Sequence, residues 1–365
     1  MSDAASSNPP VGVVVIGRNE GERLQRCLRS LVGVGRTIVY VDSGSTDGSQ
    51  DFARSLGVEV VALDMGVPFT AARARNTGLE RLLQLAPSTE FVQFVDGDCE
   101  VAPGWLEAGA RALAQDETIA AVSGRLRERF PEKSIYNRLA DLEWDRPVGD
   151  EKSCGGNAMM RVEALRRVGG FDPTLIAGEE PELCARMRAS GYRIVRIADE
   201  MALHDLAMFE QRQWMTRARR HGYAILEVSY FKTRASRGLF RKQIVSALVW
   251  GVGWPIALIA SLLSFAWTLL VLEGDVLTAA SIGLLVTLVA MRFVQFLRLY
   301  RYGLNRRLGK EVAHKYAALL FSSKSANVRG MAQFLWRRLR GRRSQVIDYK
   351  AAVPAPVQPA PLPGR

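Results

Sequence analysis

The 365-residue sequence has few cysteines and histidines, the residues that form metal clusters and disulfide frameworks. It contains four cysteines and three histidines, and the cysteines are widely scattered with no C-x-x-C pair. This spacing argues against a zinc-ribbon type of site and against a disulfide scaffold. We therefore expect the thiols to be reduced, as they are in a cytosolic compartment.

Two further absences concern the N-terminus and a long internal segment. Residues 1–10 are polar and lack the apolar stretch of a signal peptide, so we expect them to be disordered. Residues 244–272 carry no charge, and residues 276–297 carry only Arg292. Because a membrane-spanning helix needs about 20 apolar residues, the sequence predicts a two-helix transmembrane hairpin over 244–297. The alternative is a buried helical hairpin of a soluble domain.

The chain is basic, with 49 Lys and Arg residues against 37 Asp and Glu residues and a net charge of +12. The basic side chains gather on both outer flanks of the apolar segments, whereas the short turn at 273–275 is acidic. By the positive-inside rule, both termini then face the cytoplasm. This placement predicts contact with an anionic membrane leaflet and not with nucleic acid.

Residues 11–235 alternate between predicted strands and helices. The first strands are expected at 11–16, 37–41 and 58–63. Asn19 and Glu22 have the spacing of a capping box for the helix that follows the first strand. This rhythm predicts an α/β domain with a mostly parallel sheet.

The remaining segments differ from this domain in composition. We expect residues 236–243 to form a juxtamembrane link and residues 298–345 to form a basic cytoplasmic segment. Around Trp336, apolar residues alternate with arginines, which is typical of an interfacial helix or of an ordinary solvated basic helix. Residues 346–365 are rich in proline and are expected to be a disordered tail.

Carboxylates follow two of the predicted strands at the point where each strand ends. Asp42 ends the second strand, and Asp96 and Asp98 follow the buried strand at 91–95. Ligands of parallel sheets bind at the carboxyl ends of strands. Carboxylates suit Mg²⁺ or Mn²⁺, and such an ion can neutralise a leaving diphosphate. Taken alone, however, the D-x-D pattern also occurs in plain turns.

Six segments, in order and with matching spacing across roughly residues 11–235, resemble the motifs of glycosyltransferase family 2. They are Val13–Glu20, Val39–Asp47 (the VDDGSTD signature), Ala74–Gly78 (ARNxG), Phe94–Asp98 (the D-x-D strand end), Gly155–Asn157 (the glycine loop facing the donor) and Gly178–Leu183 (EDxxL). The resemblance implies a GT-A-like nucleotide-sugar domain of the membrane-anchored bacterial type. It also implies a nucleoside diphosphate sugar donor and a divalent cation.

The resemblance further assigns roles to residues at matching positions. The donor-binding residues are Asp42 at the nucleobase, Arg75 at the diphosphate or base, Asp96 at the ribose or metal, and Gly155, Gly156 and Asn157. The metal ligands are Asp98, Asp96 and His204. For His204 the alternative is a structural role, since a lone histidine has many uses.

The catalytic base implied by the resemblance is Glu180, at a position where the family usually has Asp. Pro181 is suited to the first turn of a helix that runs to Ser190, so Glu180 lies near a helix N-terminus. The helix dipole there favours the ionised form that a base requires. Glu179 is an equal alternative, because the two acids are adjacent.

The segment from Gln211 to Trp214 resembles the QxxRW element of membrane polysaccharide synthases only in part, because no arginine precedes the tryptophan. Further basic residues follow, including Arg217. We expect a cationic, aromatic loop that closes over the diphosphate or contacts a lipid phosphate. The alternative is a solvated face close to the membrane.

Together these features predict an inverting glycosyltransferase at the cytoplasmic face of the bacterial inner membrane. The acceptor would be lipid-linked or an envelope glycan, as in exopolysaccharide biosynthesis. One alternative is a non-catalytic nucleotide-sugar-binding scaffold subunit of a polysaccharide assembly complex, in which loss of the carboxylates is expected. A second is a membrane-anchored nucleotidyltransferase, which needs a lysine-containing phosphate loop that the first strand lacks.

Overall fold

The structure is a computed structural model that describes residues 10–33, 35–271 and 275–341. The strands of this part are β1 (Val11–Gly17), β2 (Ile38–Asp42), β3 (Glu59–Ala62), β4 (Phe91–Asp96), β5 (Cys99–Val101), β6 (Ile119–Glu128), β7 (Gly149–Asp150), β8 (Ala158–Arg161) and β9 (Arg193–His204). The helices up to residue 231 are α1 (Glu22–Arg29), α2 (Ser49–Ser55), α3 (Ala71–Leu85), α4 (Trp105–Gln115), α5 (Ile135–Trp144), α6 (Val162–Val168), α7 (Glu179–Ala189) and α8 (Gln211–Phe231).

The strands form one mixed sheet in the order β3-β2-β1-β4-β8-β6-β9-β5, with β7 beside β9. The first four strands of this order are parallel, and β8 runs antiparallel to both β4 and β6. In this register Gly17 pairs with Asp42, and Ile16 pairs with Asp96. The two strand-end carboxylates therefore lie at the same edge of the sheet, and the predicted α/β fold with a largely parallel sheet is confirmed.

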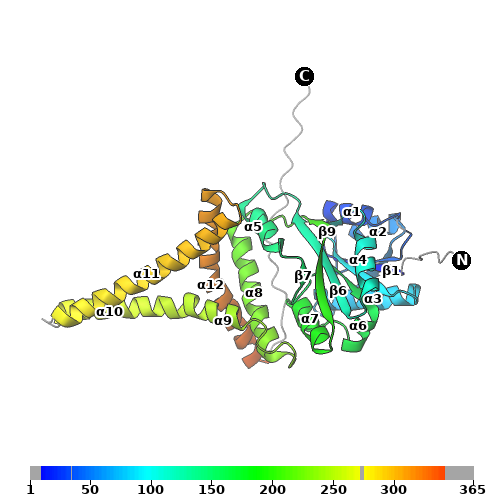
Figure 1. The fold of residues 1–365 in the computed structure, drawn as a ribbon. Coiled ribbons are helices and arrows are strands. Elements are labelled where there is room, and N and C mark those ends of the chain that lie inside the picture. The colour runs from blue at the N-terminus through cyan, green and yellow to red at the C-terminus, as the bar shows by residue number, and fades with distance from the viewer. Residues whose placement is uncertain (1–9, 34, 272–274, 342–365) are drawn as a thin grey trace, which may run out of the picture.

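Helices cover both faces of the sheet, which makes three layers (Figure 1). One apolar core joins a sheet face to α1, α2 and α4, through residues such as Leu28 and Trp105. The other core joins the opposite face to α3, α6 and α7, through residues such as Leu82 and Leu183. A strand buried on both faces reads as a continuous apolar run, as the sequence of β1 does.

The predicted capping box at the first helix is wrong. The residue before α1 is Gly21, and no side chain caps the helix. Asn19 instead adopts a left-handed conformation, with φ of 52°, and joins two loops. Its Oδ1 accepts a hydrogen bond from the backbone N–H of Thr46 at 2.8 Å, and its own N–H donates to Ser45 Oγ at 2.9 Å. Asn19 therefore joins the loop after β1 to the loop after β2. The spacing of residues near Asn19 does not predict this contact, because its partners are distant in sequence.

Between residues 241 and 339 the described part of the chain is mostly helical. These helices are α9 (Arg241–Leu248), the π-helix η1 (Val249–Gly253), α10 (Trp254–Val271), α11 (Asp275–Asn305) and α12 (Lys310–Leu339). Two runs, 241–270 and 276–305, are long and apolar enough to cross a membrane, judged by length and composition alone. Only 17% of the apolar stretch of the first run and 11% of that of the second are buried.

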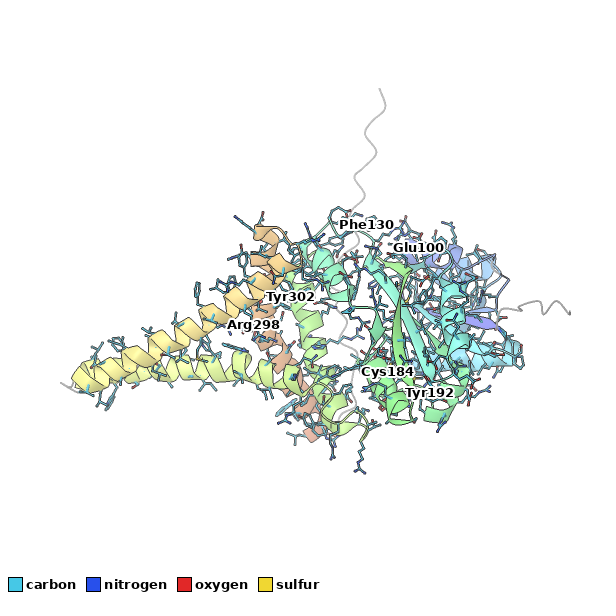
Figure 2. All side chains as sticks on the ribbon, in the orientation of Figure 1. Glu100, Phe130, Cys184, Tyr192, Arg298 and Tyr302 are labelled. Carbon is cyan, nitrogen blue, oxygen red and sulfur yellow. The ribbon has the colours of Figure 1, made fainter. Side chains whose placement is uncertain are left out.

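Helices α10 and α11 project away from the sheet, and their side chains point into open space along most of their length (Figures 1 and 2). This exposure argues against a hairpin buried in a soluble domain, because large exposed apolar surfaces need a lipid or protein cover. Most of the acidic turn between the two helices lies outside the described residues. So do the Pro-rich tail and, apart from Pro10, the N-terminus expected to be disordered.

Helices α8 and α12 form a layer between the sheet domain and the hairpin (Figure 1). Their backbones touch: a Cβ atom added at Gly222 lies 2.0 Å from the backbone oxygen of Asn327, and one at Gly330 lies 2.0 Å from that of Arg219. Trp214 Nε1 also donates to Ser323 Oγ at 2.9 Å. The expectation of a loop after Gln211 is therefore wrong, because this segment is a helix whose tryptophan is buried against α12.

The C-terminal end of α12 has two kinds of surface. Phe334 is buried, and its ring lies 5.2 Å from the Tyr223 ring and 5.0 Å from the Phe231 ring, measured between centroids. Trp336 and Leu339 are exposed. One face of the predicted basic segment thus packs on α8, while the other keeps the apolar side chains that suit an interface.

Candidate active site

The first part of the site is an ion-pair network around Arg75 on α3. Arg75 is 2% exposed, its Nη1 donates to Glu179 Oε1 at 2.8 Å, and its Nη2 donates to Asp96 Oδ1 at 2.8 Å. Burial raises the pKa of Glu179, but the guanidinium of Arg75, a backbone hydrogen bond and the charge of Arg220 together hold it below its usual value. Three predicted site residues from α3, β4 and α7 therefore meet in one network.

The glycine loop lies directly against this network. Asn157 accepts a hydrogen bond from the Asp96 backbone N–H on its Oδ1 at 2.9 Å. A Cβ atom at Gly156 lies 2.7 Å from Arg75 Nη2 and 2.9 Å from Asp96 Oδ2, and Gly155 has a φ of +85°. Only glycine allows this approach without displacing the ion pair. The loop thus brings backbone atoms to the carboxylate that the resemblance assigns to the donor.

The second part of the site is the pair of Asp98 and His204. His204 is the last residue of β9 and pairs in register with Cys99 of β5, so the neighbouring Asp98 reaches it across the strands. His204 Nε2 lies 2.9 Å from Asp98 Oδ2, and the possible ligand atoms of Asp98, Cys99 and His204 all lie within 4.8 Å of one another. A carboxylate oxygen and an imidazole nitrogen fit Mn²⁺ or a similar divalent ion, whereas the thiol suits softer metals. The third predicted ligand, Asp96, pairs with Arg75, and its role at the metal stays a prediction.

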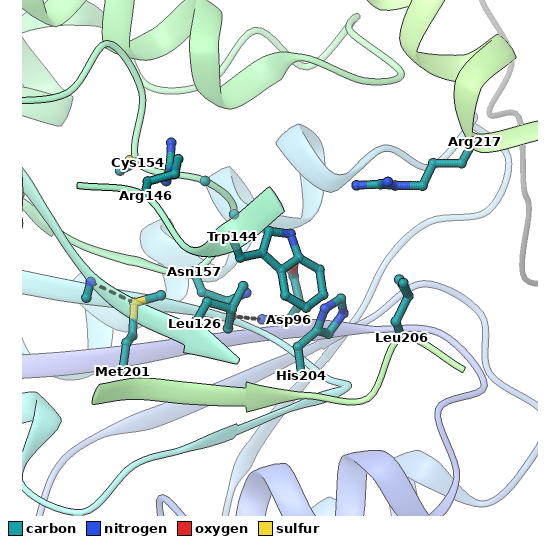
Figure 3. Close-up of a pocket in the computed structure, with 13 residues that line it drawn as sticks. Asp96, Leu126, Trp144, Arg146, Cys154, Asn157, Met201, His204, Leu206 and Arg217 are labelled. Carbon is teal, nitrogen blue, oxygen red and sulfur yellow. Dashed lines mark hydrogen bonds between the residues drawn. The ribbon is translucent and has the colours of Figure 1, made fainter. Parts of the chain in front are cut away.

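A cavity of about 220 Å³ opens beside both parts of the site. Asp96, Asn157 and His204 line it, together with Trp144 at the end of α5 and Arg217 of α8. Figure 3 shows the Trp144 ring over His204 and the Arg217 side chain reaching in from α8. The centroids of the Trp144 and His204 rings are 4.7 Å apart. The cavity combines an aromatic wall with cationic and carboxylate groups, as nucleotide and sugar sites do.

Sequence reasoning did not identify Trp144, Arg146 or Cys99 as site residues. Trp144 and Arg146 line the cavity from a stretch that has no recognisable motif. Arg217 was grouped only with a run of basic residues, and its individual position depends on how α8 packs. A signal for Cys99 existed, since it directly follows the D-x-D pattern, but cysteine is not a usual ligand of the ions expected there.

Glu180 lies in the first turn of α7, as its neighbourhood predicts, and the helix begins at Glu179 after Gly178. Its Oε1 accepts a hydrogen bond from the Cys154 backbone N–H at 2.6 Å, and the Cys184 Sγ is 3.2 Å away. Its Oε2 makes no hydrogen bond to any residue that the structure describes. Glu180 therefore holds the loop that edges the cavity, while its own side chain is buried and is not among the residues that line the cavity.

Asp42 is fully buried and organises its own loop. Its Oδ1 accepts from Tyr40 Oη, and its Oδ2 accepts from Gln50 Nε2 and the backbone N–H groups of Gly44 and Ser45, all within 3.0 Å. Burial would raise the pKa of Asp42, but these hydrogen bonds, led by that from Ser45, hold it below its usual value. Asp42 is not among the residues that line the cavity, and its role at a nucleobase stays a prediction.

Comparison with known proteins identifies the family and the fold of the chain. The model of "Glycosyl transferase family 2" matches residues 12–169, and that of "Glycosyl transferase family group 2" matches residues 92–294. A pre-mycofactocin glycosyltransferase of Mycobacterium tuberculosis is 29% identical over 229 residues, which are 59% of this chain and 47% of that protein. The succinoglycan biosynthesis protein ExoA of Rhizobium meliloti is 26% identical over 199 residues, 50% of this chain and 59% of that protein. The chain thus spans about half the length of these curated relatives.

Among solved structures, the chain is similar to a mannosyltransferase from Pyrobaculum calidifontis in complex with GDP-Man and Mn²⁺. The TM-score is 0.60 at 19% identity, and the match covers 91% of this chain and 89% of the other. At this identity the likeness shows the fold, which is GT-A-like. Because the second family model covers more than half of the sequence, the chain belongs to glycosyltransferase family 2.

Proposed function

We propose that the chain transfers a sugar from a nucleoside diphosphate sugar to a hydroxyl group of a lipid-linked or envelope-glycan acceptor, with inversion. The observation that carries this proposal is the meeting of the Arg75–Asp96–Glu179 network and the Asp98–His204 pair at one cavity. The names of the relatives, one of them a succinoglycan biosynthesis protein, support sugar transfer in polysaccharide synthesis.

The donor diphosphate would lie between cations and the metal site. Arg75 is shared between two carboxylates, whereas Arg217 reaches into the cavity and pairs with Glu143 at 2.9 Å. Both guanidinium groups present forked donors that match phosphate oxygens. Trp144 offers a flat apolar face for the sugar or the base. These residues bind and orient the donor.

Asp98 and His204 would hold the divalent cation, as their donor atoms fit it. When bound, the cation supplies positive charge that stabilises the leaving diphosphate. The fold neighbour crystallised with GDP-Man and Mn²⁺ supports such a metal, and either Mg²⁺ or Mn²⁺ suits a carboxylate and an imidazole. The backbone N–H of Asp205 donates to the Asp98 carbonyl at 2.9 Å, which holds the two metal-binding segments together.

Glu180 would take the proton from the acceptor hydroxyl on Oε2, because Oε1 is occupied by the Cys154 backbone N–H and the Cys184 thiol. Glu179 is a weaker candidate, because its lowered pKa makes it a poorer proton acceptor and its Oε1 is paired with Arg75. Its pairing with Arg75 makes Glu179 a positioning residue. A single base opposite the leaving group fits one in-line displacement, and such a displacement inverts the anomeric carbon.

We further propose that α10 and α11 anchor the enzyme in the bacterial inner membrane, with the catalytic domain and both termini in the cytoplasm. The low burial of the apolar helices supports this placement, as do the basic residues at the base of the hairpin, among them Arg298 on α11 (Figure 2). Anionic lipids of the inner leaflet would then meet the basic flanks. A lipid-linked acceptor would reach the enzyme from the same surface.

The test is turnover of a panel of UDP-, GDP- and dTDP-sugars by purified membranes that contain the protein, with Mn²⁺, with Mg²⁺ or with a chelator. We expect metal-dependent release of one nucleoside diphosphate by the wild type and none by Asp98→Ala. Asp51→Ala is the matched control, since the Asp51 side chain is 88% exposed on α2. No turnover of any donor, even with native lipid extract, would favour the non-catalytic scaffold.

A further inference from the structure

A second cavity lies outside the donor site, between α8, the C-terminal end of α12 and two loops of the sheet domain. Its volume is about 480 Å³. The apolar part of its wall includes Val67, Pro68, Tyr223 and Phe334. Helices α8 and α12 build much of this wall, so the cavity depends on elements that follow the first family match, which ends at residue 169.

One wall of this cavity carries a buried carboxylate with an unused oxygen. Glu227 is 5% exposed, and its Oε2 atom is buried without a hydrogen-bond partner in the described part of the chain. Burial also raises the pKa of Glu227 to about 7, so the carboxyl both accepts and donates protons near neutrality. Leaving a buried polar atom unsatisfied costs about 1–3 kcal/mol. A donor group on a ligand in the cavity would remove that cost.

The charges around the cavity balance one another. Lys232 Nζ lies 3.2 Å from Asp172 Oδ2 and 3.7 Å from Glu227 Oε1. Arg338 also lines the cavity and stacks on the Phe231 ring at 4.6 Å. Two cations thus face two carboxylates, and because Glu227 is only partly ionised near pH 7, the wall carries at most a small positive charge. Donors and acceptors beside aromatic rings match the hydroxyl groups and apolar faces of a neutral sugar.

Helix α8 links this cavity to Glu179, the neighbour of the proposed base Glu180. Arg220 donates to the Ile176 carbonyl at 3.1 Å and contributes to the lowered pKa of Glu179. Tyr223 and Glu227 follow Arg220 at helical spacing, so the three share one face of α8. With a rise of 1.5 Å per residue, Glu227 lies about 10 Å along the helix from Arg220.

Two loops that line the second cavity, around Thr70 and Pro173, contact each other and lead into helices that carry donor-site residues. Thr70 lines the cavity and caps α3, where it accepts from the Arg73 N–H at 3.1 Å. Its hydroxyl also donates to the Pro173 carbonyl at 3.0 Å, which joins the two cavity loops. Since α3 carries Arg75, the second cavity and the donor site share α3, α8 and the loop that leads to α7.

We propose that this second cavity binds a sugar residue of the glycan acceptor, remote from the hydroxyl that reacts. This assignment rests on the proposed function. Glu227 accepts hydrogen bonds from the sugar hydroxyls, Lys232 and Arg338 donate to them, and Tyr223 and Phe334 contact the ring. The occupant is a neutral, hydroxyl-rich ring, and the reacting end of the acceptor extends along α8 toward Glu180.

The test measures saccharide binding to the full-length, detergent-solubilised protein by saturation-transfer NMR. The probes are di- and trisaccharides of glucose, galactose, mannose and N-acetylglucosamine. Two variants target the cavity: Glu227→Leu removes the carboxylate, and Val67→Trp fills the space from an exposed loop position. Their controls are Glu311→Leu, an exposed acid at the start of α12, and Leu85→Trp, an exposed apolar residue at the end of α3. Thermal melting confirms that each variant is folded.

We expect at least one saccharide to bind the wild type and both controls. It should bind Glu227→Leu about tenfold more weakly, as the loss of one charged hydrogen bond predicts. Val67→Trp should weaken binding by at least as much, because the indole ring takes the space of the sugar. Equal binding by the folded cavity variants would overturn the proposal. So would displacement of the bound saccharide by added inorganic phosphate, because that result would indicate an anion site.

The two proposals fail in different ways. If the membranes turn over a donor but no saccharide binds the wild type, the glycan cavity is refuted and the transferase activity stands. If saccharides bind as expected but no donor is turned over, the cavity is supported as a glycan site and the proposed transfer is refuted.

Discussion

The donor site and the α10–α11 hairpin use their side chains in opposite ways. In the donor site, a buried side chain such as Arg75 has two partners from distant elements at 2.8 Å. In the hairpin, most side chains are apolar and exposed, as Leu263 and Leu270 are. The geometry of the donor site depends on individual side chains and their partners, whereas the hairpin depends mainly on apolar composition and helix length. Single substitutions should therefore have large effects in the first region and small ones in the second.

Arg292 is an exception within the hairpin. Its guanidinium lies 3.0 Å from the centroid of the Phe321 ring and 4.6 Å from that of Trp254, and its Nη1 donates to the Trp250 carbonyl at 3.3 Å. Phe321 belongs to α12, so Arg292 connects the hairpin helix α11 to the layer formed by α8 and α12. A charged side chain within an apolar helix is costly unless it has partners, and Arg292 has such partners in these rings and this carbonyl.

The largest expected effect tests the base within the donor site. Glu180→Gln keeps the size of the side chain and removes its basicity, so we expect kcat to fall about 100- to 10,000-fold. Glu179→Gln is the matched variant, and its main effect should be a higher KM for the donor because it weakens the hold on Arg75. Steady-state kinetics with the donor found in the panel measures both. A greater loss of kcat in Glu179→Gln than in Glu180→Gln would exchange the two roles.

The next effect tests the buried ion pairs. Arg75→Met leaves Asp96 and Glu179 without their cation, and breaking a buried pair in this way destabilises a protein by about 3 kcal/mol or more. Arg127→Met breaks the half-exposed pair with Glu200, for which less than about 1 kcal/mol is expected. Thermal unfolding of the two variants in detergent compares them. Equal melting temperatures would show that the donor-site network contributes no more than a surface pair.

A third prediction compares two glycines, one in the helix layer and one in the hairpin. Gly222→Ala places a methyl group 2.0 Å from the Asn327 backbone oxygen and should cost about 2 kcal/mol by overpacking. Gly283→Ala in α11 meets nothing within 4 Å, and alanine should stabilise that helix by up to about 1 kcal/mol. Opposite shifts in melting temperature are expected. Destabilisation by both would contradict the view that the hairpin tolerates changes of shape.

The smallest expected effect is a pH dependence. Burial raises the folded-state pKa of Glu227 from 4.5 to about 7, so the unfolded chain binds fewer protons between these values and stability falls as pH rises through this window. Glu227→Gln removes this loss and should stabilise the protein by at least about 1 kcal/mol at pH 8 and by less near pH 5. Melting curves at both pH values measure the difference. Stabilisation confined to pH 5 would contradict the buried state of this carboxyl.

Much of the site follows from local sequence, because the carboxyl ends of parallel strands meet at one sheet edge. Asp96 and Asp98 could be placed there from the strand before them, and Glu180 from the helix start after Gly178. Trp144 and Arg217 could not, because each reaches the cavity only through the packing of α5 and α8. The capping role of Asn19 failed for the same reason, since its partners are 26 and 27 residues away.

The sequence by itself determined the alternation of strands and helices, the family, the strand-end carboxylates and the two apolar helices. These features depend on periodicity, composition and short motifs, which act over a few neighbouring residues. Only the tertiary structure decided that Asp96 pairs with Arg75 while Asp98 meets His204, and that α12 packs on α8 to close a second cavity. Those choices depend on contacts between residues far apart in the chain, where packing and charge pairing select one partner among several that local sequence allows.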